Sequence, residues 1–269
     1  MLYRRENVPM QPEKTAMTTE NDDALARIAD LPRAFALLTR LPVPQADAAR
    51  AGAAAWAYPV VGLALGALAA LAGALALGLG LPAPLAALIA LAALVLMTGA
   101  MHEDGLADCA DGFWGGWTPA RRLEIMKDSR IGSYGVIALV LSLTARWAAL
   151  WLLFEGGAGA GAAALMAAGA ASRAAMPALM ATLPHARDEG LSRSVGTVSA
   201  RTACLAAGLA LGSALLLTGW SALPALFWVV VLSIAMAHLA QAKINGQTGD
   251  ILGAAQQIAE IAVLFSLVA

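Results

Sequence analysis

Residues 58–100 read YPVVGLALGALAALAGALALGLGLPAPLAALIALAALVLMTGA and contain no charged side chain. A helix that crosses a lipid bilayer needs about 20 mostly apolar residues, so this run is long enough for two crossings. Pro82 and Pro84 lie near its middle, where a turn would join the two helices. The run therefore predicts a protein whose helices span a membrane.

The composition of the whole chain agrees with this prediction. Of its 269 residues, 60% are hydrophobic and only 13% are charged, and the mean hydropathy is +0.71. Because water-soluble domains average about a quarter charged residues, lipid must cover much of this surface. The net charge of −1 does not provide the concentrated basic surface that nucleic acids require, so no nucleic-acid partner is expected.

Further apolar stretches bring the prediction to about seven transmembrane helices in an all-α, polytopic bundle. The expected crossings are two in residues 58–100, two in 131–183, two in 202–242 and one in 251–269. Glycines within 156–161, and Ser221 with Pro224, would separate the paired crossings. Residues 25–41 carry an apolar stripe but are too short to cross, so we expect a helix lying at the membrane interface.

The positions of the cations predict the orientation. With seven crossings, every Lys and Arg outside the crossings falls in segments that share one side of the membrane. The positive-inside rule assigns that side to the cytoplasm and leaves the C-terminus outside. Residues 1–24 are polar and mixed in charge, and we expect a disordered cytoplasmic tail there, followed by one integral membrane domain over residues 25–269.

The segment richest in chemistry is His102-Glu-Asp-Gly-Leu-Ala-Asp-Cys-Ala-Asp-Gly112. On an α-helix, Asp104, Asp108 and Asp111 fall within about 60° of one another. Three carboxylates on one stripe repel each other unless a cation lies among them, and oxygen ligands suit Mg²⁺, or Mn²⁺ in its place. The alternative is a solvated acidic helix face. We favour metal binding because small apolar residues flank the stripe within a loop otherwise rich in cations.

A basic segment, Arg121-Arg-Leu-Glu-Ile-Met-Lys-Asp-Ser-Arg-Ile-Gly132, follows directly. Its Lys and Arg side chains can bind phosphate oxygens, and Arg can do so through two hydrogen bonds. Alone, such a segment would indicate topology or contact with lipid headgroups. Next to a metal-binding acidic helix it predicts a phosphate clamp, and the two segments together indicate phosphoryl transfer.

Three more polar residues lie within or beside the expected crossings. Arg146 and Arg173 lie inside them, where a charge at the bilayer centre costs about 2.5–3.5 kcal/mol and needs partners. For Arg146, a substrate contact and a structural ion pair with Glu260 are equally open, whereas for Arg173 we favour a substrate contact. Asp250 either closes a polar loop over a ligand or caps an ordinary helix.

These residues resemble the cobalamin (5′-phosphate) synthase family, the adenosylcobinamide-GDP ribazoletransferases. The resemblance covers about residues 30–269 and is most specific in Asp-Gly-Leu-Ala-Asp-x-x-Asp-Gly over 104–112 and Ile-Met-Lys-Asp-Ser-Arg-Ile-Gly over 125–132. Glu103, where relatives often have an apolar residue, and Arg146, where a lysine is expected, depart from the family pattern.

The resemblance implies a Mg²⁺-dependent transferase of cobalamin biosynthesis in the bacterial inner membrane, with its active site on the cytoplasmic face. It would join adenosylcobinamide-GDP to α-ribazole, or to α-ribazole 5′-phosphate, and release GMP. We assign the metal to Asp104, Asp108 and Asp111. The catalytic assignments are Asp111 as base, with Glu103 or His102 in reserve, and Lys127 and Arg130 as charge-neutralising groups. The substrate-binding assignments are His102, Asp128, Ser129, Arg146, Arg173 and Asp250.

Two other functions remain as alternatives. The CDP-alcohol phosphotransferases carry aspartates at similar spacing, but their Asp-Gly-x-x-Ala-Arg start is not matched here. A divalent-cation transporter would place acidic residues at mid-membrane depth in repeated halves, and the sequence contains no such repeat. Membrane lipid is an expected partner, and a homo-oligomer is left open.

Overall fold

The computed structural model describes residues 24–43 and 50–269. Across these ranges the chain is helical and has no β-strand, only an isolated bridge between His185 and Gln247. The α-helices are α1 (Asp30–Leu38), α2 (Tyr58–Gly78), α3 (Ala83–Thr98), α4 (Met101–Gly115), α5 (Pro119–Ile125), α6 (Ser133–Glu155), α7 (Ala158–Thr182), α8 (Leu191–Val195), α9 (Ala200–Thr218), α10 (Ala222–Ile244) and α11 (Gly249–Val268). Two short 3-10 helices are η1 (Ala53–Ala57) and η2 (Gly219–Ser221). The all-α prediction is confirmed, whereas the predicted tail lies outside the described residues except for Ala24.

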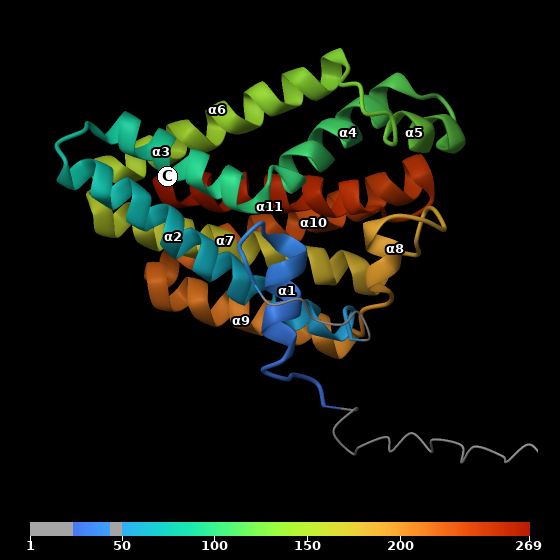
Figure 1. The fold of residues 1–269 in the computed structure, drawn as a ribbon, viewed down its shortest axis with the longest axis horizontal. Helices are drawn as coiled ribbons and strands as arrows, with labels where there is room; N and C mark the ends of the chain where they lie inside the picture. Colours follow the sequence, from blue (N-terminus) through green and yellow to red (C-terminus); the bar gives the residue numbers. More distant parts are fainter. Residues whose placement is uncertain (1–23, 44–49) are drawn as a thin grey trace, which may run out of the picture.

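The long helices lie side by side in one bundle. In Figure 1, α6 forms the upper edge and α9 the lower edge, with α7 and α11 between them. α7 packs against α2, α9 and α11, and it is the most buried of the long apolar helices. The bundle is therefore built around α7.

Within the described residues, five segments are long and apolar enough to cross a membrane. They are Ala53–Gly78, Ser133–Glu155, Ala158–Thr182, Ala200–Ile244 and Gly249–Val268. α3 and α4 add a sixth crossing only if they are taken together, across an 85° bend. The longest segment contains both α9 and α10, which η2 divides. The predicted number of seven is not confirmed, but the polytopic helical architecture is.

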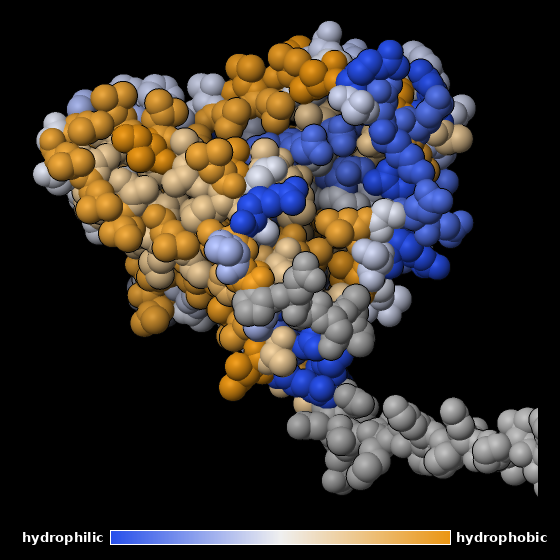
Figure 2. Space-filling view, viewed as in Figure 1, coloured by the Kyte–Doolittle hydropathy of each residue, from blue (hydrophilic) through white to orange (hydrophobic). Residues whose placement is uncertain are grey.

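Apolar and polar surfaces separate along the bundle. Figure 2 shows hydrophobic side chains over the end that contains the α2–α3 turn, and hydrophilic side chains at the opposite end around α5 and α8. Large apolar side chains are exposed on the long helices, among them Leu75, Leu216 and Phe227. Such a surface is stable in contact with lipid and supports the membrane assignment.

Glycines allow α2 and α7 to touch through their backbones. A Cβ atom on Gly62 would collide with the backbone of Gly169, and one on Gly66 would collide with the backbone of Leu165. In a membrane, such close packing replaces the hydrophobic effect as the force that holds helices together. The Gly62/Gly66 pair, one of the small-xxx-small spacings in the sequence, therefore lies at a helix–helix contact.

A sharp bend turns α4 away from α3. The two residues between these helices, Gly99 and Ala100, both have left-handed backbone conformations, with φ of 65° and 57°. Glycine adopts this conformation without steric cost, which explains Gly99, whereas Ala100 adopts it at some cost. We treat α4, with its four acidic residues, as a polar helix outside the membrane-spanning segments.

A second backbone contact joins α4 to α11. A Cβ on Gly105 would lie 2.9 Å from the carbonyl oxygen of Asp250 and 3.3 Å from Cα of Gly253. A Cβ on Gly253 would lie 3.2 Å from Cα of His102. This contact brings the start of the acidic helix against the first turn of α11.

α1 is shorter than the predicted interfacial helix over residues 25–41. It begins at Asp30, whose carboxylate accepts a hydrogen bond from the Arg27 backbone N–H at 3.0 Å. The same carboxylate is fully buried and accepts from Trp56 Nε1 at 2.9 Å. The early part of the apolar stripe, with Leu25 and Ile28, therefore precedes the helix rather than forming its face.

A buried ion-pair network connects α4, α6 and α11. The Arg146 guanidinium donates to Glu103 Oε1 at 3.0 Å and to Glu260 Oε1 at 3.3 Å. Gln257 Nε2 donates to the same Glu103 oxygen at 3.2 Å and accepts through Oε1 from Ser142 Oγ at 3.2 Å. The ion pair with Glu260 is the one that the structural interpretation of Arg146 predicted. The network fixes α4 to two long helices.

The α2–α7 contact predicts that two glycine substitutions, one at the contact and one away from it, differ in their effect on stability. Gly62→Ala should destabilise the protein by about 1–3 kcal/mol, because the added methyl group cannot enter a backbone contact. Gly208→Ala, on an exposed helix face with no atom within 4 Å of the new Cβ, should be neutral or slightly stabilising. Thermal unfolding in detergent measures both, and equal midpoints would contradict the contact.

The ion-pair network predicts a strong distinction between two substitutions of Arg146. Arg146→Met leaves two buried carboxylates without their cation, and should cost about 3–5 kcal/mol of stability. Arg146→Lys keeps the charge and should retain most of the stability. The midpoint of thermal unfolding in detergent separates these outcomes, and a Met variant as stable as the Lys variant would count against a structural role for the ion pair.

Candidate functional site

The three aspartates of α4 have different surroundings. Asp104 is exposed, Asp108 is half-buried and Asp111 is buried. Although helical spacing puts them on one stripe, the bend and the packing of α4 bury the stripe progressively toward its C-terminal end. The three carboxylates are therefore not equivalent candidates for a metal ion.

Asp111 caps the N-terminus of α6. Its Oδ2 accepts from the Gly132 backbone N–H at 2.7 Å, and its Oδ1 accepts from the Gly135 N–H at 2.9 Å. A carboxylate at this position satisfies backbone donors that have no partner within the helix, and it interacts favourably with the helix dipole. A Cβ on either glycine would collide with this carboxylate, which explains both glycines.

The acidic helix and the basic segment face one cavity of about 410 Å³, which we name the polar cavity. Asp104 and Asp108 line it from α4, and Lys127, Ser129 and Arg130 line it from the loop before α6. The remaining described residues that line it are Ala100, Glu103, Ala107, Met126, Asp128, Ile131 and Leu139. The sequence predicted that the two charged segments act together, and the polar cavity brings them together.

The cations of the polar cavity are held by exposed ion pairs. Arg130 Nη2 lies 2.7 Å from Asp128 Oδ2, and Lys127 Nζ lies 3.5 Å from Glu189 Oε2. Hydrogen bonds from Arg130 lower the pKa of Asp128 below its usual value. Exposed ion pairs contribute little to stability, so these cations can exchange their carboxylate partners for phosphate oxygens.

The other two arginines of the basic segment, Arg121 and Arg122, do not line the polar cavity and are not placed to bind a phosphate there. Arg122 donates to the backbone carbonyls of Gly116 and Lys243, each at 3.0 Å, and so ties α5 to the end of α10. Arg121 forms a surface ion pair with Glu124 at 2.8 Å. Of the four cations in this segment, only Lys127 and Arg130 are placed to bind a phosphate in the polar cavity.

A second cavity of about 140 Å³, which we name the apolar cavity, lies on the other side of Asp104. Asp104 is the one described residue that lines both cavities. The remaining residues of its lining are Leu37, Leu38, Tyr58, Met101, His102, Met176, Met180, Arg187, Leu191, Ser192, Val195, Gly249, Asp250, Leu252 and Gly253. Two spaces of different chemistry therefore meet at one carboxylate.

Asp250 lies in the apolar cavity as part of an ion pair. Its Oδ2 accepts from Arg187 Nη2 at 3.0 Å and from Thr248 Oγ1 at 3.1 Å. The cap of α11 is Thr248 rather than Asp250, because the Thr248 side chain accepts from the Ile251 backbone N–H. The alternative prediction, that Asp250 is an ordinary N-cap, is therefore wrong, because the capping residue is Thr248. The Asp250 carboxylate lies at the apolar cavity instead.

Negative charges gather around Asp108. Partial burial, together with the nearby charges of Asp250, Asp104 and Asp111, raises the pKa of the Asp108 carboxyl to about 7, and Arg187 opposes this shift. A bound divalent cation would relieve the same repulsion, and all the donors are oxygens, the ligands that Mg²⁺ prefers. Asp104 and Asp108, with Asp250 nearby, thus have the chemistry that fits a magnesium ion.

The side chains are not arranged as a complete metal site. In the part of the chain that the structure describes, no group of three or more His, Cys, Asp or Glu side chains is close enough to hold a metal ion. Asp111, the third ligand expected from the sequence, has both oxygens engaged with α6. Its roles as ligand and base stay predictions.

The remaining predicted residues are split between the cavities and the core. His102 is buried and lines the apolar cavity, whereas Arg146 lies in the ion-pair network and lines neither cavity. Arg173 is also buried away from both, and its Nη1 donates to the Gly169 carbonyl at 3.2 Å. The structure brings neither arginine to a surface that a substrate can reach.

Sequence reasoning misses three residues, two at the apolar cavity and one in the core. Arg187 and Tyr58 line the apolar cavity, and Gln256 donates to Ser172 Oγ at 3.0 Å in the core. Arg187 lies in a loop whose cations the positive-inside rule explains as a topology signal. Gln256 lies one position before Gln257 in a span whose one charged residue is Glu260, and two adjacent amides in a membrane helix indicate a buried polar network.

Comparison with known proteins gives a consistent result. Residues 30–268 match the family described as Cobalamin-5-phosphate synthase. A protein of Bradyrhizobium diazoefficiens named adenosylcobinamide-GDP ribazoletransferase is 46% identical over 249 residues, which cover 88% of this chain and 92% of that protein. Proteins of the same name from Mesorhizobium japonicum and Brucella ovis are 46% and 44% identical, over 87% and 90% of this chain and 91% and 96% of their own lengths.

No solved structure matches this chain. The family match, however, spans the whole described bundle from α1 to α11, including both charged segments of the polar cavity. With relatives this similar over this much of the chain, the protein belongs to the cobalamin-5-phosphate synthase family.

Proposed function

We propose that this protein is a membrane transferase that joins adenosylcobinamide-GDP to α-ribazole, or to α-ribazole 5′-phosphate, and releases GMP. The names of its relatives give the transferase and its activated substrate. The observation that carries the proposal is the meeting of two cavities at Asp104, one lined by cations and carboxylates and the other mostly apolar. Such an arrangement can position two substrates of different chemistry for phosphoryl transfer.

The diphosphate of the activated substrate would bind in the polar cavity. Lys127 and Arg130 line it and can donate to phosphate oxygens, Arg130 through two parallel hydrogen bonds. Ser129, between them in sequence, would add a hydroxyl donor. Positioning and charge neutralisation of this kind make up most of the catalysis of phosphoryl transfer.

The acceptor hydroxyl would approach from the apolar cavity. The 3′-oxygen attacks the phosphorus attached to cobinamide, a new P–O bond forms, and the P–O bond to the GMP phosphate breaks with its electron pair leaving on GMP. The proton of the hydroxyl needs an acceptor within hydrogen-bond reach. We assign it to Asp104 rather than to Asp111, because Asp104 faces both cavities and Asp111 caps α6.

Asp104 and Asp108, with Asp250 nearby, are the residues that would hold a magnesium ion. When bound there, the ion would supply charge neutralisation for the diphosphate. Asp128 would remain the partner of Arg130 until a phosphate oxygen replaces it. The ion-pair network of Arg146, Glu103 and Glu260 would keep α4 in position while the charges of the site change.

The polar surface of the bundle supports a location for the active site. The loop before α6 and helix α8, which line the polar and the apolar cavity respectively, lie toward the end of the bundle where hydrophilic side chains gather in Figure 2. The positive-inside rule and the water-soluble nucleotide that must reach the site support a cytoplasmic active site in the bacterial inner membrane.

The transporter alternative has less support. The buried acidic residues Glu103 and Glu260 are both ion-paired with Arg146 rather than free to bind a passing cation. The family membership also favours a transferase over both a transporter and a CDP-alcohol phosphotransferase.

Substitution of Asp104 tests the proposed reaction. Asp104→Asn should lower the rate of GMP release at least 100-fold while the protein stays folded, because this exposed carboxylate supports chemistry rather than packing. GMP release is measured from lipid-reconstituted protein with Mg²⁺, adenosylcobinamide-GDP and α-ribazole. Asp188→Asn, an exposed carboxylate that lines neither cavity, is the control and should keep the wild-type rate. A folded wild-type protein that releases no GMP would refute the proposal.

Substitution of Asp111 separates a capping role from a metal role. Asp111→Asn can satisfy only one of the two α6 amides with its remaining oxygen, so it should lower stability by about 0.5–2 kcal/mol. The Mg²⁺ concentration for half-maximal rate should stay close to that of the wild type. Thermal unfolding and a Mg²⁺ titration of GMP release measure the two effects. A large increase in the Mg²⁺ requirement at unchanged stability would instead identify Asp111 as a metal ligand.

A further inference from the structure

Three residues that line the apolar cavity carry a buried polar atom that has no hydrogen-bond partner in the described part of the chain: Tyr58 Oη, His102 Nε2 and Arg187 Nη1. Arg187 is ion-paired with Asp250 through its other terminal nitrogen, and Tyr58 and His102 are only 1% exposed. A buried polar group without a partner destabilises the fold. A protein that keeps several of them beside one cavity has the features of a site in which a ligand supplies the partners.

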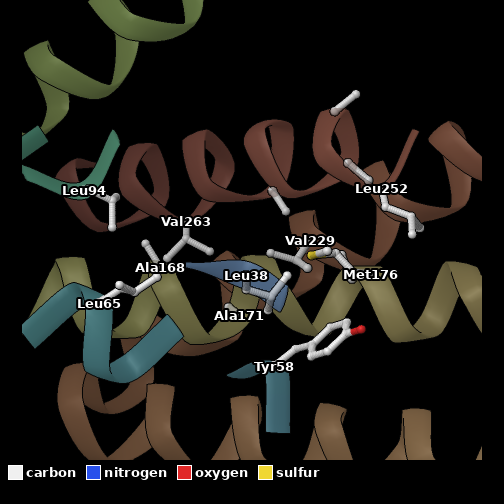
Figure 3. Close-up of a cluster of buried hydrophobic side chains, with 14 of the residues drawn as sticks. Leu38, Tyr58, Leu65, Leu94, Ala168, Ala171, Met176, Val229, Leu252 and Val263 are labelled. Atoms are coloured by element: carbon white, nitrogen blue, oxygen red, sulfur yellow. The ribbon is translucent and has the colours of Figure 1, made fainter. Parts of the chain in front are cut away.

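Most of the remaining wall is apolar and comes from several elements. Leu38 of α1, Met176 of α7 and Leu252 of α11 line the cavity together with Tyr58, and all four are labelled in Figure 3. Methionine side chains adapt their shape and make favourable contacts with aromatic rings. A flat heterocycle is the kind of ligand that such a wall fits.

The size and charge of the apolar cavity limit which part of the two substrates it can hold. A cavity of about 150 Å³ accepts an aromatic ring such as benzene, so one of 140 Å³ takes a flat ring system but excludes a corrin macrocycle. Arg187 is the single Lys or Arg among the described residues of the lining, and it is paired with Asp250. A diphosphate would therefore prefer the polar cavity, which leaves the apolar cavity to the less charged substrate.

The Tyr58 and His102 atoms also discriminate between bases. Guanine presents a carbonyl oxygen, a ring N–H and an amino group along one edge, and needs a partner for each. A benzimidazole attached to a sugar has one free ring nitrogen, which a single hydroxyl or imidazole N–H can satisfy. A single donor within the apolar part of the wall fits the second kind of base.

Building on the proposed function, we propose that the apolar cavity binds the heterocyclic base of the acceptor nucleoside, with Tyr58 Oη as the donor to its free ring nitrogen. The base lies between Leu38, Met176 and Leu252. The ribose then extends toward Asp104, where the two cavities meet, and its hydroxyls lie within reach of His102 Nε2. Tyr58 becomes a residue that selects the base of the acceptor.

Tyr58→Phe tests this assignment, because it removes only the hydroxyl. The KM for α-ribazole should rise about three- to tenfold, the usual effect of losing one hydrogen bond, while the KM for adenosylcobinamide-GDP stays unchanged. The variant should unfold at the same temperature as the wild type or higher without acceptor, since an unpaired buried hydroxyl is gone. Tyr134→Phe, half exposed and outside both cavities, is the matched control and should change neither KM.

A second variant blocks the cavity without removing a polar group. Leu191 is 49% exposed at the cavity wall, so Leu191→Trp should be tolerated by the fold while it narrows the space for the base. It should also raise the KM for α-ribazole selectively. If either variant raised the KM for adenosylcobinamide-GDP instead, the cavity would hold the guanosine part and the assignment would be overturned.

A binding measurement separates failure of this assignment from failure of the proposed function. Equilibrium dialysis of α-ribazole against wild-type and Tyr58→Phe protein, without adenosylcobinamide-GDP, requires no turnover. A three- to tenfold weaker affinity of the variant supports the cavity even if no GMP is released. Equal affinities of the two proteins, in a preparation that does release GMP, overturn the cavity and leave the transferase intact.

Discussion

The ion pairs of Arg146 with Glu103 and Glu260 hold the functional end of the molecule in place. They connect the acidic helix α4 to α6 and α11 inside an apolar bundle, where a charge without a partner is costly. Because Glu103 is adjacent to Asp104 in sequence, the pair that fixes α4 also fixes the direction of the exposed carboxylate. The buried network thus fixes the direction of the Asp104 carboxylate, although Arg146 itself lines neither cavity.

Backbone contacts through glycine complete this positioning. The α4–α11 contact at Gly105 and Gly253 brings Asp104 near Asp250, and the bend at Gly99 turns the acidic helix out of the direction of α3. A Cβ atom at Gly105 or Gly253 would lie too close to the facing backbone, so the two helices would have to move apart. The glycines within the acidic segment are therefore part of the geometry of the site and do not merely add flexibility.

Much of the fold could be predicted from the sequence because hydropathy and charge are local properties. The turn at Pro82, the break at Gly156 and the union of the acidic and basic segments all follow from neighbouring residues. The role of Asp111 at α6 and the partners of Arg146 depend on helices that meet only in three dimensions. Spacing shows which carboxylates share a helix face, but it does not show which of them another helix will cover.

The position of Asp104 between two cavities has a consequence for the kinetic mechanism. Under the proposed function each cavity holds its own substrate, so both are bound before any bond breaks, and no part of a substrate has to be attached to the protein in between. The proposed function therefore implies a direct, sequential transfer through a ternary complex, in which the stereochemistry at phosphorus is inverted once.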